Sequence, residues 1–294
     1  MFLEELVASA LRMMVPILLT AIGAVFTERA GVVNIGLEGM MIVGSFWGAV
    51  GSYYFGPYVG LLIAMIAGGM LALVHAIATV TFRIDQVVSG VALNILAYGS
   101  SRFLCQTFFS MATTTPHVAG LPKIRIPLLG DTSFIIILAL LLVPFSTFVL
   151  NQTVFGLRLR SVGENPWAAD TLGINVFKMK YAGVLISGIL AGLAGAYLSL
   201  EHTGMYVEGM TQGKGFIALA AMIFGNWTPQ GALWASLLFG FTESLSFRVV
   251  ESGAIPYQFI KMIPYVLTLI VLSGVVRKST PPAADGIPYE KETK

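Results

Sequence analysis

Long apolar runs separated by short polar turns make up most of this chain. An α-helix needs about 20 apolar residues to cross the hydrocarbon core of a membrane, which is about 30 Å thick. Charges, prolines and glycine clusters delimit nine such runs. They lie near residues 7–27, 34–55, 58–82, 86–109, 132–150, 181–200, 215–226, 231–248 and 258–276. The pattern predicts an all-α fold, a polytopic membrane helix bundle of about nine spans.

The seventh run, 215–226, is shorter than the others. Gly213 and Gly215 bound it in front, and Pro229 bounds it behind. We expect either a short, tilted span or a re-entrant half-helix.

The distribution of Lys and Arg predicts the orientation, because these residues collect in cytoplasmic loops. Ten of the 17 fall in the loop 151–180, the tail 277–294 and the turns at Arg29 and Arg83. If those segments are cytoplasmic, all four runs between the loop and the tail must cross, the short one included. The count favours nine crossings, with the N-terminus outside and the C-terminus inside. We divide the chain into a transmembrane domain, 1–276, and a cytoplasmic tail, 277–294.

Composition excludes most other classes of protein. AVILMFWYC residues make up 56% of the chain and charged residues only 11%, whereas soluble domains carry about 25% charged residues. Glu4 and Glu5 stand where a cleavable signal would be positively charged, so we expect the first run to remain. Cys105 is the single cysteine and cannot close a disulfide within the chain. The net charge of +2 forms no basic face, so no nucleic-acid partner is expected.

The loop 151–180 is the one long polar stretch expected on the cytoplasmic side. Its centre predicts a short helix with Asn165 as the N-cap, Pro166 in the first position and Gly173 just past the end. Two helical turns are unstable alone in water, so something must hold them. The helix is interpreted either as a docking element for a cytoplasmic partner or as an interfacial helix anchored in the headgroups by Trp167.

Several motifs carry a resemblance to a known family. The segment GLRLRSVGENPWAADTLGIN at 156–175 resembles the coupling loop of permeases from ATP-binding-cassette importers, in the group that serves branched-chain amino acids, ribose and other simple sugars, and nucleosides. The likeness continues in ERAGVVNIGLEGMM, RIDQVVSGVALNILA, GFIALAAMIFGNWTPQGALWASLLFG and PPAADGIPYE, at 28–41, 83–97, 215–240 and 281–290. Within this group the chain most resembles permeases of bacterial purine-nucleoside (guanosine-type) and simple-sugar importers.

The resemblance implies a multi-pass permease in the bacterial cell membrane, in contact with lipid. Its implied partners are a separate ATPase subunit, a second and different permease subunit, an extracellular substrate-binding lipoprotein and a nucleoside substrate. A simple sugar such as ribose is the alternative substrate. The residues expected to couple the permease to the ATPase are Gly163, Glu164, Asn165, Ala168, Ala169 and Gly173.

Motifs that the sequence lacks narrow the chemistry. It contains no G-x-x-x-x-G-K-[ST] phosphate loop, so ATP hydrolysis is expected on another chain. It also contains no H-E-x-x-H, no G-x-S-x-G and no Cys/His cluster, so no catalytic site, cofactor or metal is expected. An ion-coupled secondary carrier is less favoured, because the runs offer few acidic or histidine relays. A non-transporting membrane scaffold is a further alternative.

Glycine-broken segments mark the expected substrate pathway, because interrupted helices in membranes expose backbone groups to a cavity. Two occur, NIGLEG at 34–39 and QGKGF at 212–216. We expect Asn94 and Phe216 to line the route, with Glu38 nearby. For Asn94, a hydrogen bond to a neighbouring helix is an equally good interpretation.

Other residues within the runs are assigned to packing or left open. Gly90 and Gly99 should let neighbouring segments approach the run that holds Asn94. His75 is expected to be hydrogen-bonded between helices. Arg102 and Glu243 have either structural or functional roles, and Glu243 could pair with Arg248. The glycines of IAGGM and GILAGLAGAY, at 66–70 and 188–197, are interpreted as close helix contacts.

Overall fold

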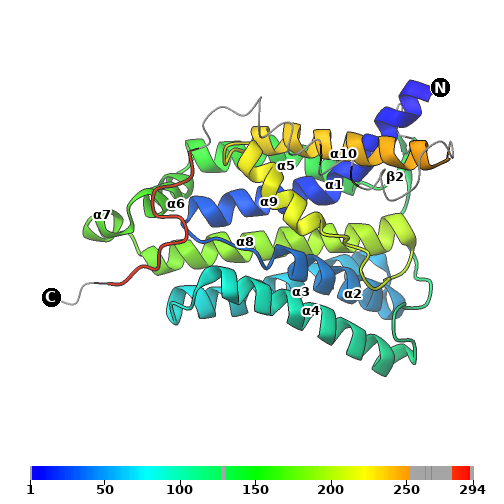
Figure 1. Cartoon of the computed structure of the whole chain (residues 1–294), viewed down its shortest axis with the longest axis horizontal. Helices are drawn as coiled ribbons and strands as arrows, with labels where there is room; N and C mark the ends of the chain where they lie inside the picture. The colour runs from blue at the N-terminus through cyan, green and yellow to red at the C-terminus, as the bar shows by residue number, and fades with distance from the viewer. Residues whose placement is uncertain (1, 127–129, 252–261, 263–265, 267–279, 292–294) are drawn as a thin grey trace.

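A computed structural model describes residues 2–126, 130–251, 262, 266 and 280–291 of the chain. The described part is a bundle of helices, most of which run along the long axis of the molecule (Figure 1). The ninth apolar run, 258–276, lies almost entirely outside the described residues.

The helices follow the predicted runs closely. Their bounds are α1 Phe2–Arg29, α2 Leu37–Phe55, α3 Pro57–Ala76, α4 Gln86–Phe109, α5 Ile135–Gln152, α6 Val154–Glu164, α7 Pro166–Thr171, α8 Val176–Tyr197, α9 Lys214–Phe224 and α10 Pro229–Glu251. Two π-helical turns, η1 Ile77–Thr81 and η2 Leu198–Thr203, extend α3 and α8. Each of the first eight predicted runs therefore coincides with a helix.

Five helical segments among the described residues are long and apolar enough to cross a membrane. They are Glu5–Arg29, Pro57–Thr81, Gln86–Phe109, Ile135–Gln152 and Val176–Thr203. They correspond to the first, third, fourth, fifth and sixth runs. The helices of the second and eighth runs, α2 and α10, are not among these five, and α9 is a shorter apolar helix.

Two features between the runs differ from the expectation. The all-α fold is confirmed for the bundle, which in addition carries a small antiparallel hairpin between α4 and α5, in which β1, Ile124–Ile126, pairs with β2, Gly130–Thr132. Much of the segment 151–180 is helical rather than loop. An additional helix, α6, precedes the predicted short helix. α6 buries Gly156, Leu159 and Gly163, which share one face at helical spacing.

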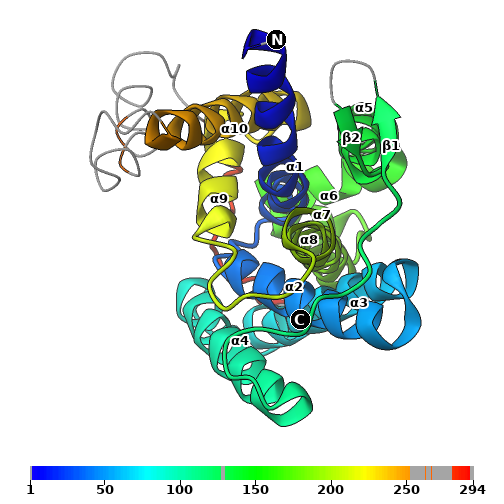
Figure 2. The same cartoon turned by 90° about the vertical axis from the view of Figure 1, so that its right-hand side faces the viewer.

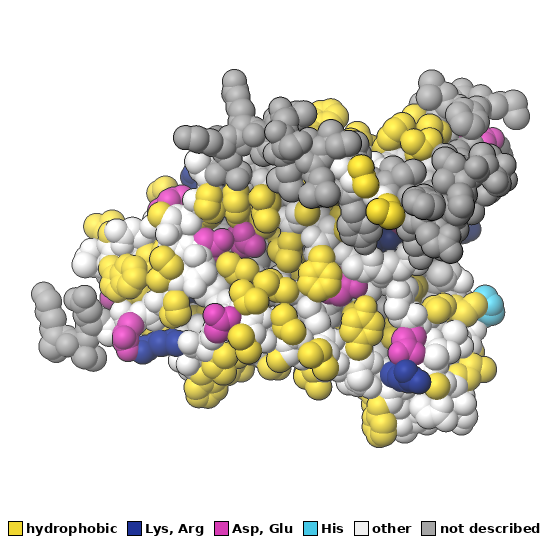
Figure 3. All heavy atoms as spheres, viewed as in Figure 1, with side chains coloured by type: hydrophobic (Ala, Val, Ile, Leu, Met, Phe, Trp, Pro, Cys, Tyr) yellow, Lys and Arg dark blue, Asp and Glu magenta, His cyan; other side chains and the backbone are white. Residues whose placement is uncertain are grey.

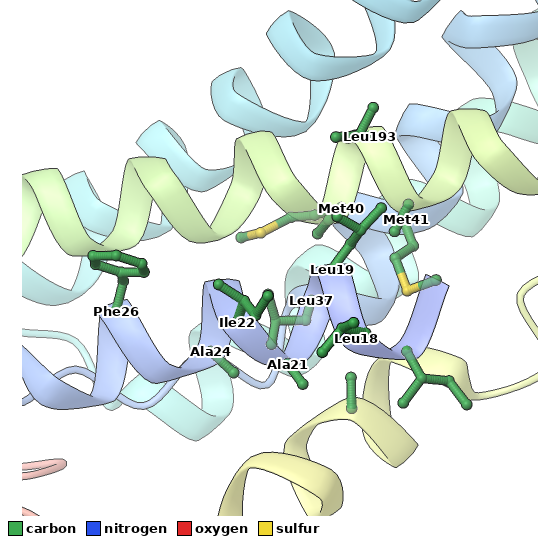
Figure 4. Packing of buried hydrophobic residues seen from close by; sticks show 14 of the residues in the cluster. Leu18, Leu19, Ala21, Ile22, Ala24, Phe26, Leu37, Met40, Met41 and Leu193 are labelled. Carbon is green, nitrogen blue, oxygen red and sulfur yellow. The ribbon is translucent and has the colours of Figure 1, made fainter. Parts of the chain in front are cut away.

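The core lies where α1, α2 and α8 meet. Seen end-on, α8 is surrounded by α1, α2 and α3 (Figure 2). Figure 4 shows Leu19 and Ile22 of α1 pointing toward Met40 of α2 and the ribbon of α8, and all three side chains are buried. Such packing needs small residues where backbones approach closely.

Glycines provide these close approaches, as the sequence analysis predicts. A Cβ atom on Gly44 of α2 would lie 2.5 Å from Cα of Gly192 in α8. Gly68 of α3 lies against Gly188 and Gly192 with no room for a side chain. The small-residue faces of α2, α3 and α8 are therefore packing surfaces.

The outer surface of the bundle is largely apolar. On the face shown in Figure 3, Lys, Arg, Asp and Glu side chains are scattered in small groups among hydrophobic ones. The exposed hydrophobic side chains include Leu62 and Ile66 of α3 and Ile95 of α4. This distribution is that of a protein whose solvent over much of its surface is lipid.

Candidate functional site

Residues 30–36, which connect α1 to α2 in the sequence, are not helical and turn back into the bundle. We call them the re-entrant segment. After α1 ends at Arg29, residues 30–36 double back along α1 before α2 begins (Figure 1). The turn uses Gly31 at φ +75°, a conformation that favours glycine. Asn34 Nδ2 donates to Ser187 Oγ at 2.8 Å, and Ser187 lies in the middle of α8. α2, which has 19 residues, thus starts inside the bundle after a non-helical stretch of chain.

Side chains of α3 and α4 satisfy the backbone of this segment. Val33 N donates to Gln86 Oε1 at 2.6 Å. Val33 O lies 3.1 Å from His75 Nε2, which must be the donor because a carbonyl oxygen only accepts. Ring nitrogen Nδ1 of His75 is then the acceptor for the Ser89 hydroxyl, at 2.9 Å. An unpaired backbone group in hydrocarbon costs several kcal/mol, so these side chains allow the non-helical segment to exist within the bundle.

Asn94 of α4 completes the set with both ends of its amide. Its Nδ2 donates to Ile35 O at 3.1 Å and its Oδ1 accepts from Gly39 N at 2.7 Å. Asn94 is buried, with 8% of its surface exposed. The interhelical hydrogen bond that the sequence left open for Asn94 is therefore present.

The two glycines near Asn94 behave differently from each other. A Cβ on Gly90 would lie 2.8 Å from Gly36 N, so Gly90 does allow the re-entrant segment to approach α4. Nothing lies within 4 Å of a Cβ on Gly99. The expectation of a close approach at Gly99 is wrong, because that position is on the open side of α4.

A second irregular segment meets the first at Glu38. α9 begins at Lys214 after the irregular segment 204–213. Glu38 Oε1 accepts from Thr211 Oγ1 at 2.5 Å and from Gly213 N at 3.0 Å, and Oε2 accepts from Gly215 N at 2.7 Å. A helix N-terminus carries unpaired N–H groups and a partial positive charge. The Glu38 carboxylate, only 1% exposed, therefore caps α9 from the first turn of α2.

The close contact between α9 and α2 at this junction explains why the QGKGF segment has a glycine at position 215. A Cβ on Gly215 would lie 2.5 Å from both Cα and N of Glu38. α9 then runs to the end of the bundle where α1 finishes. There Trp227 Nε1 donates to Glu28 Oε2 at 2.6 Å, and Arg29 Nε donates to Trp227 O at 2.9 Å. The short seventh run is thus a helix of 11 residues that extends from the bundle interior to one end.

The structure brings Glu38, Asn94 and Phe216 together. Asn94 binds the residue after Glu38, and Phe216 follows the glycine that binds Glu38. The Phe216 side chain is 47% exposed. Tyr98, one turn beyond Asn94, is 37% exposed, and its hydroxyl interacts with Glu38 and Thr211. The sequence analysis missed Gln86, Thr211 and Ser187, because the sequence around a single uncharged polar side chain does not indicate which distant residue it binds.

Two ion pairs settle the partners of other charged residues. Lys214 Nζ lies 2.6 Å from Glu243 Oε1, and their side chains are 7% and 19% exposed. This pair joins α9 to α10, so Glu243 has Lys214 as its partner. The second pair joins Arg102 Nη1 to Glu208 Oε1 at 3.4 Å, and the Arg102 side chain is 61% exposed.

The segment expected to couple to an ATPase folds as the sequence predicts. Asn165 Oδ1 accepts from Ala168 N at 3.0 Å, and Pro166 opens α7. Gly173, at φ +79°, lies just past the end of the helix, where Gly173 N donates to Asp170 O and Ile174 N donates to Ala169 O. These two bonds form a Schellman motif. The predicted cap residues at both ends of the short helix are confirmed.

The six expected coupling residues divide between two faces. Glu164, Asn165, Ala168 and Gly173 are exposed, whereas Gly163 and Ala169 are buried. A Cβ on Gly163 would strike the backbone carbonyl of Arg29 at the end of α1. Ala169 packs with Val162, Val176 and Tyr289. Trp167 and Leu172 are the large apolar side chains on the exposed side of this region, at 41% and 79%.

Comparison with known proteins places this architecture in a family. The family model described as "Branched-chain amino acid transport system / permease component" matches residues 6–272. The chain is 44% identical to the guanosine ABC transporter permease protein NupQ of Bacillus subtilis, over 98% of this chain and 97% of that protein. It is 41% identical to the nucleoside ABC transporter permease protein NupC of Lactococcus lactis, over 98% of each.

A more distant relative carries a different substrate name. The chain is 38% identical to the putative glucose ABC transporter permease protein TsgC13 of Haloferax volcanii, over 79% of this chain and 74% of that protein. No solved structure matches the chain. The chain is a multi-pass cell-membrane protein, and it belongs to the permease family of branched-chain amino acid-type ABC transport systems, whose members are transport components rather than enzymes.

Proposed function

We propose that this chain is the membrane-spanning permease subunit of an ABC importer that carries nucleosides, with guanosine among them, into the cell. The observation that carries the proposal is the full-length similarity to two permeases named for guanosine and nucleosides, at 44% and 41% identity. The sugar alternative has weaker support, because the relative named for glucose is matched over a smaller share of both chains. ATP hydrolysis would take place on a separate subunit.

The substrate route is proposed to pass the junction of α2 and α9. Interrupted helices in transporters commonly meet at the binding site near the membrane midplane. Asn94 and Glu38 would hold the starts of α2 and α9 in place, since their polar atoms are bound to backbone groups. Phe216 would contact the substrate, because its ring is half exposed and aromatic faces stack on bases by about 1–3 kcal/mol.

The lack of free charge at the junction supports an uncharged substrate. The Glu38 carboxylate is occupied by three donors, and Lys214 is paired with Glu243. A nucleoside, which is neutral, would meet no unpaired ion among these residues. A sugar would satisfy the same condition, so this feature supports both substrates over a charged amino acid.

We further propose nine crossings, with the N-terminus outside and the C-terminus inside. The crossings would be α1–α5, α8, the segment 204–213 with α9, α10 and the run 258–276. Ser244 of α10 lies beside Leu6, near the N-terminal end of α1, whereas Thr280 lies beside Asn226 at the opposite end. An odd number of crossings fits these positions. Residues 1–276 would form the membrane domain and 277–294 the cytoplasmic tail.

The ATPase subunit is proposed to dock on α7. The exposed residues in and around this helix, Glu164, Asn165, Ala168 and Gly173, would face the ATPase, while Gly163 and Ala169 would hold the helix from behind. The remaining partners, a second and different permease and an extracellular substrate-binding lipoprotein, follow from the importer class.

Uptake measurements test the substrate. A strain lacking the chain should lose ATP-dependent uptake of radiolabelled guanosine, and the wild-type chain should restore it. Ribose and glucose uptake serve as comparisons. Restoration of sugar uptake alone would establish the alternative substrate. Uptake that survives ATP depletion but is abolished by dissipating ion gradients would indicate a secondary carrier.

Cysteine labelling tests the orientation. In a Cys105→Ser background, a membrane-impermeant maleimide added outside should label His117→Cys and leave Leu172→Cys unlabelled. Both native side chains are exposed, so differences in burial do not explain the contrast. The reverse labelling pattern would overturn the proposed orientation.

A further inference from the structure

The C-terminal segment 280–291 lies across the end of the bundle that carries α6 and α7. It is drawn in red in Figure 1, next to α6 and α7 and at the end of the bundle opposite the N-terminus. The segment is not part of any helix. We call residues 280–291 the strap.

One set of contacts joins the strap to α6 and α7. Ala284 N donates to Gly163 O at 2.9 Å, and Ala283 N donates to Glu164 Oε2 at 3.3 Å. The Tyr289 ring packs edge-on against Trp167, with centroids 5.9 Å apart. Farther along, Lys291 Nζ lies 3.7 Å from Asp170 Oδ1. The contacts cover the end of α6 and much of α7.

A second set joins the strap to the bundle. Thr280 N donates to Asn226 Oδ1 at 3.0 Å, just after α9. The buried ammonium group of Lys180 in α8 donates to Gly31 O at 2.9 Å and to Ile287 O at 3.5 Å. Glu290 forms an ion pair with Arg83. The strap is therefore attached to α8 and to the connections that follow α1, α9 and η1.

Tyr289 links both sets of contacts. It is 4% exposed, and its ring also packs against Phe177 of α8, with centroids 5.5 Å apart. Together with Val162, Ala169 and Val176 it forms a separate small hydrophobic cluster. Its ring thus lies between α7 and α8.

α7 needs such support. It has only six residues, and a helix of this length is unstable without tertiary contacts. The buried face of α7 presents Ala169, and because its side chain is only a methyl group, larger side chains must pack around it. Among the described residues, Tyr289 is the buried aromatic side chain of the cluster around Ala169, and Phe177 packs against that cluster from outside, so removing the Tyr289 ring would leave α7 loosely held.

We propose that the strap is a positioning element for energy coupling, with Tyr289 as its principal positioning residue. The strap holds α7 at a fixed place relative to the bundle, so that movement of the ATPase displaces the helices rather than α7 alone. The proposal rests on the proposed function, since it presumes that an ATPase subunit docks on α7.

The test compares three substitutions in the complete importer, purified with its ATPase subunit and reconstituted in liposomes. Tyr289→Ala removes the ring, Tyr289→Phe keeps it, and Ile287→Ala shortens a side chain of the strap that is 44% exposed. The measured quantity is guanosine transported per ATP hydrolysed. Tyr289→Ala should lower it about five-fold or more, the lower end of common coupling effects. The other two variants should stay within about two-fold of wild type by the same measure.

Additional measurements separate positioning from folding. An unchanged ratio of transport to hydrolysis in Tyr289→Ala, with or without a lower melting temperature, would overturn the proposal. If that variant does not accumulate, Tyr289→Leu retains apolar volume without the ring contacts and should show the same loss of coupling; an unchanged ratio would again overturn the strap role.

A substrate-independent measurement distinguishes failure of the strap from failure of the proposed function. If wild type transports no guanosine, the nucleoside assignment fails, and the strap is then tested by the amount of ATPase subunit that co-purifies with each variant. A loss confined to Tyr289→Ala supports the strap, and equal retention in all variants overturns it.

Discussion

Substitution of Glu38 by glutamine should loosen the junction between α2 and α9. The glutamate accepts three hydrogen bonds, two of them from backbone N–H groups at the start of α9. Glutamine has nearly the same shape but only one acceptor oxygen. If that oxygen keeps Thr211 and Gly213, the amide nitrogen must face Gly215 N, and two donors then oppose each other.

The size of the effect follows from these contacts. A buried donor left without a partner costs about 1–3 kcal/mol. Loss of the negative charge at a helix N-terminus adds about 0.3–1 kcal/mol, and up to about 2 kcal/mol at partly buried sites. We therefore expect Glu38→Gln to lower the free energy of unfolding by about 2–4 kcal/mol. For a chain of this length the melting temperature should fall by about 5–10 °C.

The assay measures the melting temperature of the detergent-solubilised protein and guanosine uptake in cells. Glu208→Gln is the matched control, because its carboxylate pairs with the exposed Arg102 at 3.4 Å and exposed pairs contribute less than about 1 kcal/mol. A melting temperature of Glu38→Gln equal to that of the control would refute the capping role. Lower uptake at an unchanged melting temperature would show instead that the carboxylate acts on the substrate.

Three further predictions concern packing, docking and pH. Gly44→Ala should destabilise the protein strongly, because its Cβ would lie 2.5 Å from a backbone Cα of α8, whereas Gly99→Ala has open space and should be neutral or stabilising in the same melting assay. Ala168→Trp, on the exposed face of α7, should reduce uptake at an unchanged melting temperature, whereas Ala169→Trp, which replaces a residue 2% exposed, should reduce both; equal effects of the two would argue against docking on that face. Burial raises the pKa of Asp285 from 3.8 to about 6. The folded chain therefore holds this proton more tightly than the unfolded chain, and the added stability is lost as the pH rises through about 6. The melting temperature should be higher at pH 5 than at pH 7.5, and Asp285→Asn should reduce that difference.

The helices could be predicted from the sequence because apolar length and cap chemistry are local properties. Each of the first eight runs coincides with a helix, and the glycines of α8 pack as their spacing indicates. The ends of α7 were predictable because Asn165, Pro166 and Gly173 each act on the backbone within a few residues. The sequence analysis did not predict α6, although Gly156, Leu159 and Gly163 repeat at helical spacing. The arginines of this segment led to its interpretation as a cytoplasmic loop.

Partners far apart in the sequence could not be predicted in the same way. The glycine-broken segments at 34–39 and 212–216 indicated two interruptions, but not that the carboxylate of one would cap the helix of the other. Gln86 and Ser187 bind the re-entrant segment across intervals of 53 and 153 residues. Such bonds depend on how the helices are arranged, which one sequence does not specify. The strap likewise contacts residues more than 100 positions away.

A series of contiguous contacts connects the junction of α2 and α9, inside the bundle, to the surface around α7. Gly163, at the end of α6, lies against the carbonyl of Arg29 without room for a side chain. The guanidinium of Arg29 donates to Trp227 O, immediately after α9. The other end of α9 is fixed to Glu38. Because closely packed backbones cannot be compressed, any displacement of α6 toward α1 must move the end of α1. Through Trp227, this movement must also displace α9 and the junction that α9 forms with α2.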